Sequence, residues 1–464
     1  MEGAAALLTT LVVYKLLLLG VGAWAARRNR DQADFFLGGR TLGPWVASGS
    51  AAASSSSAWT LLGVSGAAFR YGLSAVWIFP ACLGGFALNW FLVAERLRQR
   101  SAASGAVTLT EFLAEGSRGR LRSSFVGSAS AIVLVSLGVY VASQFKAAGV
   151  TFGETLGMGQ EAAILVGAGI VLIYTMTGGF WAVSVTDLIQ GLVMAAAAVL
   201  VPLAALVEIG GPGAMLEGLR QADPALLDVW RGKTGPAALG LVIGTLGIGL
   251  GYPGQPHVVN RFMALRGPRA VRQGAAISMA WAAVIYAGML VAGWCGRGLV
   301  VGLGDHEAVL LRLTADLFPP ALAGVIVAAV LSAIMSTADS QLLVCGSAAA
   351  YDLSAKDSGS RLRRSRLAVL GIGALAVVAA ILIEETIFNS VLFAWSALGA
   401  AFGPLLLVRL WSGPVRPGYA LAAVWTGFLV TIVWFFTPAL KQSLYELVPA
   451  FAAAGLIARI GVRR

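Results

Sequence analysis

One apolar stretch, from Leu42 to Phe69, is long enough to cross a lipid bilayer and carries a run of serines in its middle. The serines fill the segment SGSAAASSSSAW, from Ser48 to Trp59. Backbone that unwinds inside a bilayer cannot face lipid, because each unpaired N–H or C=O costs several kcal/mol. Such a segment must be buried in protein or line a cavity, and broken helices of this kind hold small cations and solutes. The alternative is an unbroken helix whose small residues let neighbouring helices pack closely.

The rest of the chain is as apolar as a membrane protein requires. Hydrophobic residues make up 58% of it and charged residues 12%, and the mean hydropathy is +0.82, which is outside the range of soluble domains. The three cysteines, Cys82, Cys295 and Cys345, are far apart and indicate neither a disulfide framework nor a metal site. The first apolar segment has no small-residue cleavage site, so we expect a retained helix.

Apolar runs predict about thirteen membrane spans in an all-α, multi-span protein. The predicted spans are Ala4–Ala25, Leu42–Phe69, Leu73–Ala94, Ser124–Val150, Ala162–Gly178, Val183–Val207, Ala237–Val259, Ala275–Gly296, Pro320–Tyr351, Leu367–Ile383, Ile387–Val408, Gly418–Phe436 and Leu444–Ile460.

The basic residues predict the orientation of these spans. If the N-terminus is outside and the spans alternate, most of the 33 lysines and arginines fall in inner loops, Arg261 and Arg409 among them. An odd number of spans then leaves the C-terminus inside. We interpret the net charge of +11 as a result of this topology and of contact with anionic lipid, and we expect no nucleic-acid partner.

A second interrupted helix is predicted between Gly247 and His257, where four glycines and two prolines occur in one apolar span. Proline removes a helix hydrogen bond and glycine loosens the backbone, so the helix should unwind there. The two interrupted helices are the second and the seventh span. A separation of five spans is typical of an inverted five-helix repeat.

The ninth span carries a stripe of hydroxyl groups. Ala333, Ser336, Thr337 and Ser340 are spaced i, i+3, i+4 and i+7, which brings them to one helix face. Hydroxyls and freed backbone carbonyls together could supply the oxygens that a hard monovalent cation prefers. Ordinary close packing of small residues would also explain the stripe.

Several motifs resemble those of the sodium:solute symporter family, in family order along nearly the whole chain. They are Asp34 to Arg40 (DFFLGGR), Gly63 to Ala67 (GVSGA), Gly178 to Ser184 (GGFWAVS), Gly254 to His257 (GQPH), Met335 to Thr337 (MST) and Gly399 to Pro404 (GAAFGP). Within the family, the chain is most similar to the bacterial symporters that carry proline.

The resemblance implies a LeuT-type core of two inverted five-helix repeats inside a single membrane domain, 1–464. The peripheral first helix and loop would be 1–41, the first repeat 42–208, the second repeat 237–410, and the two C-terminal helices 411–464.

The resemblance also implies the site residues. The expected sodium ligands are Ala53, Ser56, Ala333, Ser336 and Thr337. The expected second cation site or ion path contains Asp187, Ser340 and Asp339. The expected substrate residues are Ser55, Ser57, Trp59, Tyr140, Tyr252 and Gln255. Lys146 would either meet a substrate carboxylate in an outer vestibule or extend outward to the membrane surface.

Two positions depart from the proline-transporting symporters. Ser55 stands where they have an aspartate that is important for sodium coupling, and Ile248 stands where they have a tryptophan. The first difference bears on ion affinity and the second on the shape of the substrate pocket.

The predicted function is therefore sodium-coupled symport of a small solute, L-proline first, across the bacterial inner membrane by a monomer. Alternatives are another amino acid, a small carboxylate such as pantothenate, or a transporter-like solute sensor. We expect no enzymatic activity and no cofactor besides the coupling ion. The two histidines, His257 and His306, form no catalytic set at motif spacing with a nucleophile or metal ligand.

Overall fold

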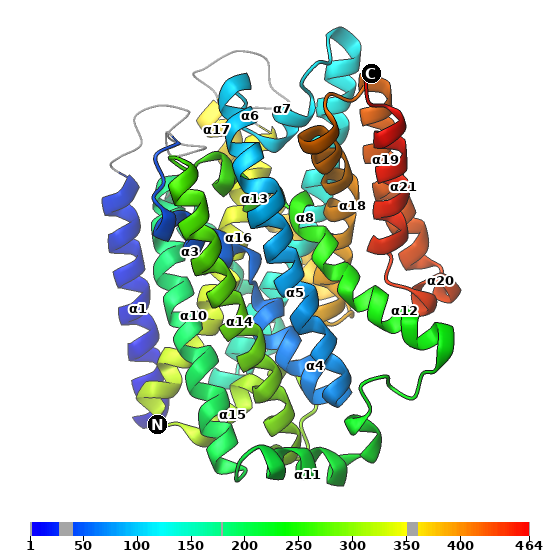
Figure 1. The fold of residues 1–464 in the computed structure, drawn as a ribbon. Coiled ribbons are helices and arrows are strands. Elements are labelled where there is room, and N and C mark those ends of the chain that lie inside the picture. Colours follow the sequence, from blue (N-terminus) through cyan, green and yellow to red (C-terminus); the bar gives the residue numbers. More distant parts are fainter. Residues whose placement is uncertain (1, 27–39, 178–179, 350–360, 464) are drawn as a thin grey trace.

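The computed structural model describes residues 2–26, 40–177, 180–349 and 361–463, and every named element in these ranges is helical. Among these residues, nine helices are long and apolar enough to cross a membrane, and three shorter apolar helices accompany them. The long helices stand side by side in one bundle (Figure 1). The predicted all-α, multi-span architecture is confirmed.

The first half of the chain supplies the outer helix and the first five core spans. Its main elements are α1 (Glu2–Ala26), α3 (Pro44–Ser55), η2 (Trp59–Gly63), α4 (Val64–Tyr71), η3 (Gly72–Trp77), α5 (Ile78–Ala87), η4 (Leu88–Ala94), α6 (Glu95–Ser104), α7 (Leu109–Leu113), α8 (Gly119–Leu156), α9 (Gln160–Thr177), α10 (Phe180–Glu208) and α11 (Pro212–Ala222). Each predicted span in this half contains helix, and the number of membrane crossings stays a prediction.

The second half follows a similar plan. Its elements are η5 (Pro224–Leu227), α12 (Gly235–Leu246), η6 (Gly247–Gly254), α13 (Pro256–Met263), α14 (Pro268–Leu299), η7 (His306–Ala308), α15 (Val309–Leu317), α16 (Pro320–Ser347), α17 (Arg361–Leu382), α18 (Ile387–Ser412), α19 (Pro417–Phe436), α20 (Pro438–Ser443) and α21 (Leu447–Ile460). Proline recurs in the first turn of these helices, where its missing N–H disrupts no helical hydrogen bond.

The centre of the bundle is formed by α16 and α18. Their most apolar windows are 83% and 78% buried by protein, whereas those of α17 and α19 are 28% buried and leave a broad face for lipid. Close approach of the helices depends on glycine. A Cβ on Gly288 of α14 would collide with the Ala198 carbonyl of α10, and one on Gly427 of α19 with Ala400 of α18.

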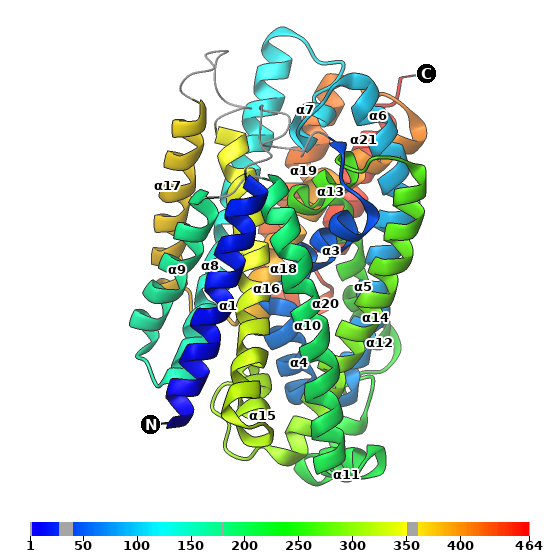
Figure 2. The ribbon, with the colours of Figure 1, turned by 90° about the vertical axis from the view of Figure 1, so that its left-hand side faces the viewer.

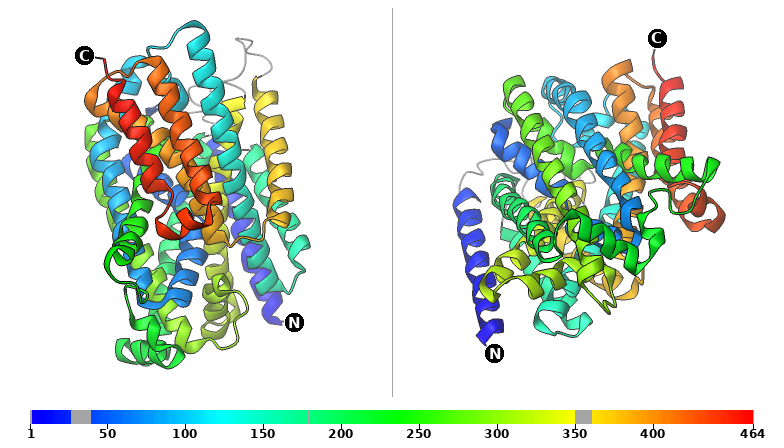
Figure 3. Two further views of the ribbon diagram at one scale, coloured as in Figure 1. Left: turned by 90° about the vertical axis from the view of Figure 1, so that its right-hand side faces the viewer. Right: turned by 60° about the horizontal axis from the view of Figure 1, so that its bottom comes forward.

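The helices outside the predicted repeats lie on opposite flanks. Figure 2 shows α1 against α10 and α16, and Figure 3 shows α19, α20 and α21 together at the far edge, where α19 and α21 pack on α18. The start of α1 and the end of α21 lie at opposite ends of the bundle (Figure 1). The number of crossings and the side on which each terminus lies stay predictions. The proposed repeat boundaries stay a prediction.

Candidate functional site

The first interrupted helix breaks inside the serine segment. α3 ends at Ser55, Ser56 and Ser57 are not helical, and the chain resumes as the π-helical turn η2. The freed Ala58 N–H donates to Gln144 Oε1 of α8 at 3.1 Å. A buried side chain on another helix therefore satisfies backbone that lipid could not satisfy.

The second interrupted helix changes its winding over a longer stretch. α12 continues as the 3-10 helix η6 up to Gly254, Gln255 is extended, and α13 begins at Pro256. A Cβ on Gly254 would be 2.6 Å from Gly399 Cα, so glycine is needed for α18 to lie this close. The predicted substrate residue Gln255 is buried, and its Nε2 donates to the Gly251 carbonyl at 3.1 Å and the Trp395 carbonyl at 3.0 Å.

Hydroxyl groups of α16 meet the carbonyls at the end of α3. Ser336 Oγ donates to Ala53 O and is 3.3 Å from it, and it also lies 3.3 Å from Ala333 O. Thr337 Oγ1 donates to Ser54 O at 3.3 Å. These groups are fully buried, and we call them the oxygen cradle: the carbonyls of Ala53, Ser54 and Ala333 with the hydroxyls of Ser336 and Thr337.

Ser56, the remaining predicted sodium ligand, lies in the break beside the cradle. Its N–H donates to Ala53 O at 3.2 Å, and its buried Oγ has no hydrogen-bond partner among the described residues. A hydroxyl without a partner is costly to bury, so it is a ready ligand for an ion or a polar solute group.

A charged cluster lies next to the cradle and shares Ser54 with it. Asp187 Oδ2 of α10 accepts from Ser50 Oγ at 2.7 Å and Ser54 Oγ at 3.2 Å, and pairs with Arg261 Nη2 of α13 at 3.1 Å. Arg261 also donates to Ser340 Oγ at 2.6 Å. We call Asp187, Arg261, Ser50 and Ser340 the inner cluster.

Asp339 belongs to the same buried neighbourhood. Its Oδ1 is 3.5 Å from Ser340 Oγ, and its Oδ2, like Asp187 Oδ1, has no hydrogen-bond partner in the described parts of the chain. Two open carboxylate oxygens therefore lie near the cradle. The structure brings together all three residues predicted for a second cation site or ion path.

The sequence prediction was wrong about Arg261. It was assigned to an inner loop because the apolar run stops at Val259, but α13 continues to Met263 and Arg261 is only 2% exposed. Arg409 is likewise buried within α18 rather than in a loop, at 4% exposed. One signal in the sequence could have shown this. Arg261 follows His257 by four positions, so if the helix continues past Val259 the two residues lie on the same helix face.

Most of the predicted substrate residues surround a closed central pocket. Ser55, Trp59, Tyr140 and Tyr252 line it, together with Ile248, Val391, Leu392 and Trp395. Its volume is about 10 Å³, room for at most one water molecule. The walls must therefore separate before a solute can bind.

Aromatic contacts hold this pocket shut. Trp59 stacks on Phe388 of α18 with ring centroids 5.4 Å apart, and Tyr252 meets Trp395 edge to face at 4.7 Å. Ser57, the remaining predicted substrate residue, has its Oγ 3.2 Å from Tyr140 Oη. Trp59 Nε1 is buried with no acceptor among the described residues, which makes it an available donor.

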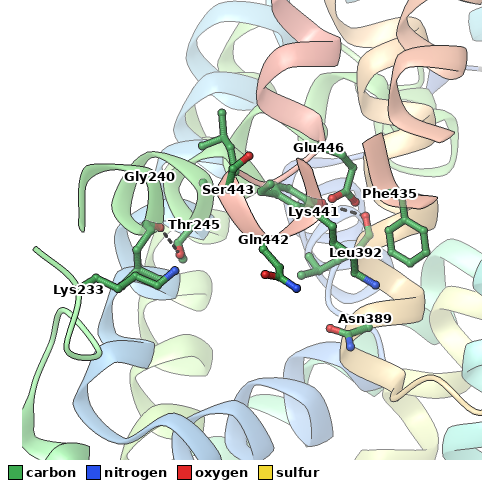
Figure 4. Close-up of a pocket in the computed structure, with 14 residues that line it drawn as sticks. Lys233, Gly240, Thr245, Asn389, Leu392, Phe435, Lys441, Gln442, Ser443 and Glu446 are labelled. Carbon is green, nitrogen blue, oxygen red and sulfur yellow. Dashed lines mark hydrogen bonds between the residues drawn. The ribbon is translucent and has the colours of Figure 1, made fainter. Parts of the chain in front are cut away.

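A second cavity, of about 220 Å³, lies beyond Leu392 toward the end that the charge pattern assigns to the outside. Figure 4 shows Lys233 and Asn389 on opposite sides of it, with Gln442 between them. Leu392 lines both cavities, and Tyr445 Oη donates to its carbonyl at 2.9 Å. This outer cavity is therefore separated from the central pocket by a thin wall.

Two charged residues make hydrogen bonds to the backbone at the start of α18 and in the loop before it. Glu307 of η7, 2% exposed, accepts from the N–H groups of Ile387 and Phe388 at 2.8 and 2.7 Å. Burial raises the pKa of this carboxyl from 4.5 to about 7, against the opposing effect of the two N–H donors. Lys146 Nζ donates to the carbonyls of Ile383 and Glu385 at 3.0 and 2.7 Å, so the structure shows it binding backbone carbonyls after α17.

Comparisons with known proteins agree with this arrangement. The profile of the sodium:solute symporter family matches residues 35–427. The chain is 37% identical to the high-affinity proline transporter PutP of Bacillus subtilis (strain 168), over 94% of this chain and 93% of that protein. It is 36% identical to the sodium/proline symporter of Escherichia coli (strain K12), over 95% of this chain and 89% of that protein.

A solved structure supports the fold. A Na⁺-coupled sialic acid symporter, substrate-bound and outward-open, matches with a TM-score of 0.81 over 98% of this chain and 97% of its own, at 19% identity. At that identity the match shows the fold alone, and the predicted LeuT-type fold is confirmed. The apolar helices and bacterial relatives identify a multi-pass protein of the inner membrane. The chain belongs to the sodium:solute symporter family.

Proposed function

We propose that this protein is a sodium-coupled symporter that carries L-proline into the cell, with sodium bound between α3 and α16. The observation that carries the proposal is the oxygen cradle, where the hydroxyls of Ser336 and Thr337 each approach a carbonyl at the end of α3 at 3.3 Å. The family profile supports sodium as the coupling ion, and the printed names of the two bacterial relatives support proline.

Sodium would bind by taking over the contacts that the cradle makes with itself. The carbonyls of Ala53, Ser56 and Ala333 and the hydroxyls of Ser336 and Thr337 are all neutral oxygens, the ligand type that hard cations prefer. Carbonyls of unwound helices serve this purpose in transporters of this architecture. Because the ligands come from two helices, the ion would join α3 to α16.

The inner cluster would provide the next oxygens for an ion that leaves the cradle. Ser54 Oγ lies 3.2 Å from Asp187 Oδ2 and 3.0 Å from Ser340 Oγ, so the cradle and the cluster are continuous. Asp187, Ser340 and Asp339 would form either a second cation site or the exit path. In both cases the ion competes with Arg261 for Asp187.

Proline would bind in the central pocket once its walls separate. A compact pyrrolidine ring suits a wall made of Trp59, Tyr140 and Tyr252, because rigid aromatic side chains present large apolar faces. Ser55, Ser57 and Trp59 Nε1 would supply polar contacts to the solute carboxylate. Gln255 would join them if its amide left the Gly251 and Trp395 carbonyls.

The outer cavity would be the access route to that pocket. Solute would pass Leu392 after α18 moves, and closure of α18 would return Phe388 to Trp59. An inward potential of 100 mV is worth about 2.3 kcal/mol per charge, so one sodium ion could concentrate the solute by tens of fold. This linkage needs sodium and solute to favour the same conformation.

The proposal is tested by uptake of radiolabelled L-proline into proteoliposomes, with and without an inward sodium gradient. We expect accumulation only with sodium, and its loss in the double variant Ser336→Ala, Thr337→Ala. Ser347→Ala is the matched control, because Ser347 is also buried on α16. Among the described residues, its hydroxyl donates to the Val344 carbonyl of its own helix at 2.8 Å and to no group of α3.

The other candidates give different results in the same assay. Uptake of another amino acid or of pantothenate, with no proline uptake, would keep sodium symport and replace the solute. Binding of proline without accumulation would indicate a sensor. Accumulation driven by a proton gradient at fixed voltage, unaffected by sodium, would refute the ion assignment.

A further inference from the structure

A cavity of about 440 Å³ lies at the end of the molecule that carries the basic loops, apart from the transport path. It is formed where α6, α7 and α18 meet the segment before α19. Its lining combines charge with apolar surface: Arg100, Ser104, Phe112, Glu115, Arg409 and Pro414. A cavity with this lining suits a ligand that has both an anionic and an apolar part.

Arg409 is the most buried of the charged residues that line this cavity. It is 4% exposed, and its Nη2 donates to the Glu115 carbonyl at 3.0 Å. Its Nε is fully buried and has no acceptor among the described residues. A buried guanidinium with an unused donor is costly. If the side chain turned toward the cavity, a bound anion would satisfy this donor with a charge-assisted hydrogen bond.

The surroundings of Arg409 are electropositive. Arg100 lines the cavity and donates to the Arg409 carbonyl. The positive charge of Arg463 is close enough to repel that of Arg409. Among the described lining residues, Glu115 alone is acidic, and it opposes these three positive charges. The balance favours an anion.

The flank next to the cavity has the composition of a membrane interface. Trp411, two residues after Arg409, is 50% exposed; its Nε1 donates to the Leu92 carbonyl and its ring lies 3.5 Å from the Arg96 guanidinium. Phe91 is 65% exposed on the same side. Exposed tryptophan beside arginine is typical of the headgroup level of a bilayer.

We propose that this cavity binds the headgroup phosphate of an anionic phospholipid from the inner leaflet, with Arg409 and Arg100 as its donors. Basic pockets between helices on the cytoplasmic side recognise anionic headgroups in this way. Phe112 and Pro414 would contact the glycerol and the first part of the acyl chains. A free phosphate ion would leave this apolar surface unused, so the lipid is the better fit.

The bound lipid would tie α18 to α6 and α7. α18 also supplies Leu392 and Trp395 to the central pocket and Phe388 to the outer closure. An anionic lipid would thus stabilise the position of α18, the helix that has to move during the transport cycle. This site is independent of which solute is carried.

The test uses the full-length protein purified in detergent and titrated with short-chain phosphatidylglycerol, phosphatidylcholine or inorganic phosphate. We expect phosphatidylglycerol alone to raise the thermal denaturation midpoint. Arg100→Gln and Arg409→Gln should each raise the half-saturating lipid concentration by on the order of tenfold, which is the contribution of one charge-assisted hydrogen bond. Arg363→Gln, an exposed charge at the start of α17, is the matched control.

Three results would overturn the proposal. The first is equal stabilisation by phosphatidylcholine, which would show a general lipid effect. The second is equal stabilisation by inorganic phosphate, which would show a simple anion site. The third is an unchanged titration in Arg100→Gln, a variant that keeps the buried Arg409 contact to Glu115 and is therefore suited to test the site if Arg409→Gln does not fold.

Discussion

The two ends of the central site are closed by different kinds of contact. Toward the basic end, charged and hydroxyl side chains of the inner cluster join α3, α10, α13 and α16. Toward the other end, aromatic stacking of Trp59 on Phe388 and carboxylate capping of the α18 N-terminus by Glu307 hold the closure. The inner closure is a buried ion pair, and the outer closure is a sum of weaker contacts.

This difference implies that the two ends open in response to different events. Removing one partner of a buried ion pair leaves an uncompensated charge and costs about 3–5 kcal/mol, so the inner cluster resists opening unless another charge replaces Arg261. A sodium ion passing Asp187 would be that charge. The aromatic stacking and the single hydrogen bonds of the outer end are worth roughly 1 kcal/mol each and can be lost one at a time.

The largest effect is expected from Arg261→Gln, which leaves Asp187 buried without its cation. We expect a loss of about 3–5 kcal/mol in unfolding free energy and the loss of sodium-driven uptake. Thermal or denaturant unfolding in detergent measures the first, and proteoliposome uptake the second.

The double variant Arg261→Gln, Asp187→Asn provides the control. Because it removes both charges, it should recover most of the stability while uptake stays impaired, if Asp187 is on the ion path. An Arg261→Gln protein as stable as the parent would show that the ion pair does not hold the inner end closed.

The second prediction concerns pH and the outer closure. Folding raises the pKa of Glu307 from 4.5 to about 7, mainly by burial. Asp305 raises this pKa further, whereas Lys146 and the Ile387 and Phe388 N–H groups lower it. The folded protein therefore binds this proton more tightly than the unfolded chain, so the stabilisation is complete below pH 4.5 and is lost as pH rises to about 7.

The expected size of this change is roughly 3 kcal/mol for Glu307 alone, at about 1.4 kcal/mol for each pH unit. Glu307→Gln should flatten the decline in thermal stability between pH 4.5 and 7. Glu385→Gln is the comparison, because Asn389 and Lys441 lower the pKa of Glu385 and its contribution has the opposite sign. If the pH dependence of thermal stability is the same in Glu307→Gln as in the parent protein, then Glu307 does not contribute to the outer closure in the way proposed.

The helices and the two interruptions could be predicted because apolar length, proline and glycine act locally. The hydroxyl stripe on α16 was also predictable, since a helix brings residues at i, i+3 and i+4 to one face. That stripe meets the carbonyls of Ala53 and Ser54, which are some 280 positions away in the chain. The contact between these two helices was predicted from the resemblance to a family and could not be predicted from helical periodicity.

The partners of buried charges could not be predicted. Arg261 and Asp187 lie 74 positions apart on different helices, and their contact depends on how α10 and α13 each pack on α3. Lys146 reaches carbonyls 237 and 239 positions away. A single sequence carries little information about such contacts, because a charge inside an apolar helix is equally compatible with pairing, with extension to the surface and with ligand binding.

The smallest effect is expected from Lys146→Met, which also tests how the outer closure is built. Lys146 supplies hydrogen bonds to carbonyls just beyond the C-terminus of α17, where a cation is favourable, and such a contact at a partly exposed position is worth about 1 kcal/mol. We expect a loss of that size in unfolding free energy, with the KM for proline changed less than about twofold. Lys146→Arg should keep the stability, because it keeps a donor. An increase in KM of about tenfold or more without loss of stability would instead show that Lys146 binds the solute. Its contribution to the outer end would then come from substrate binding and not from its hydrogen bonds to the carbonyls after α17.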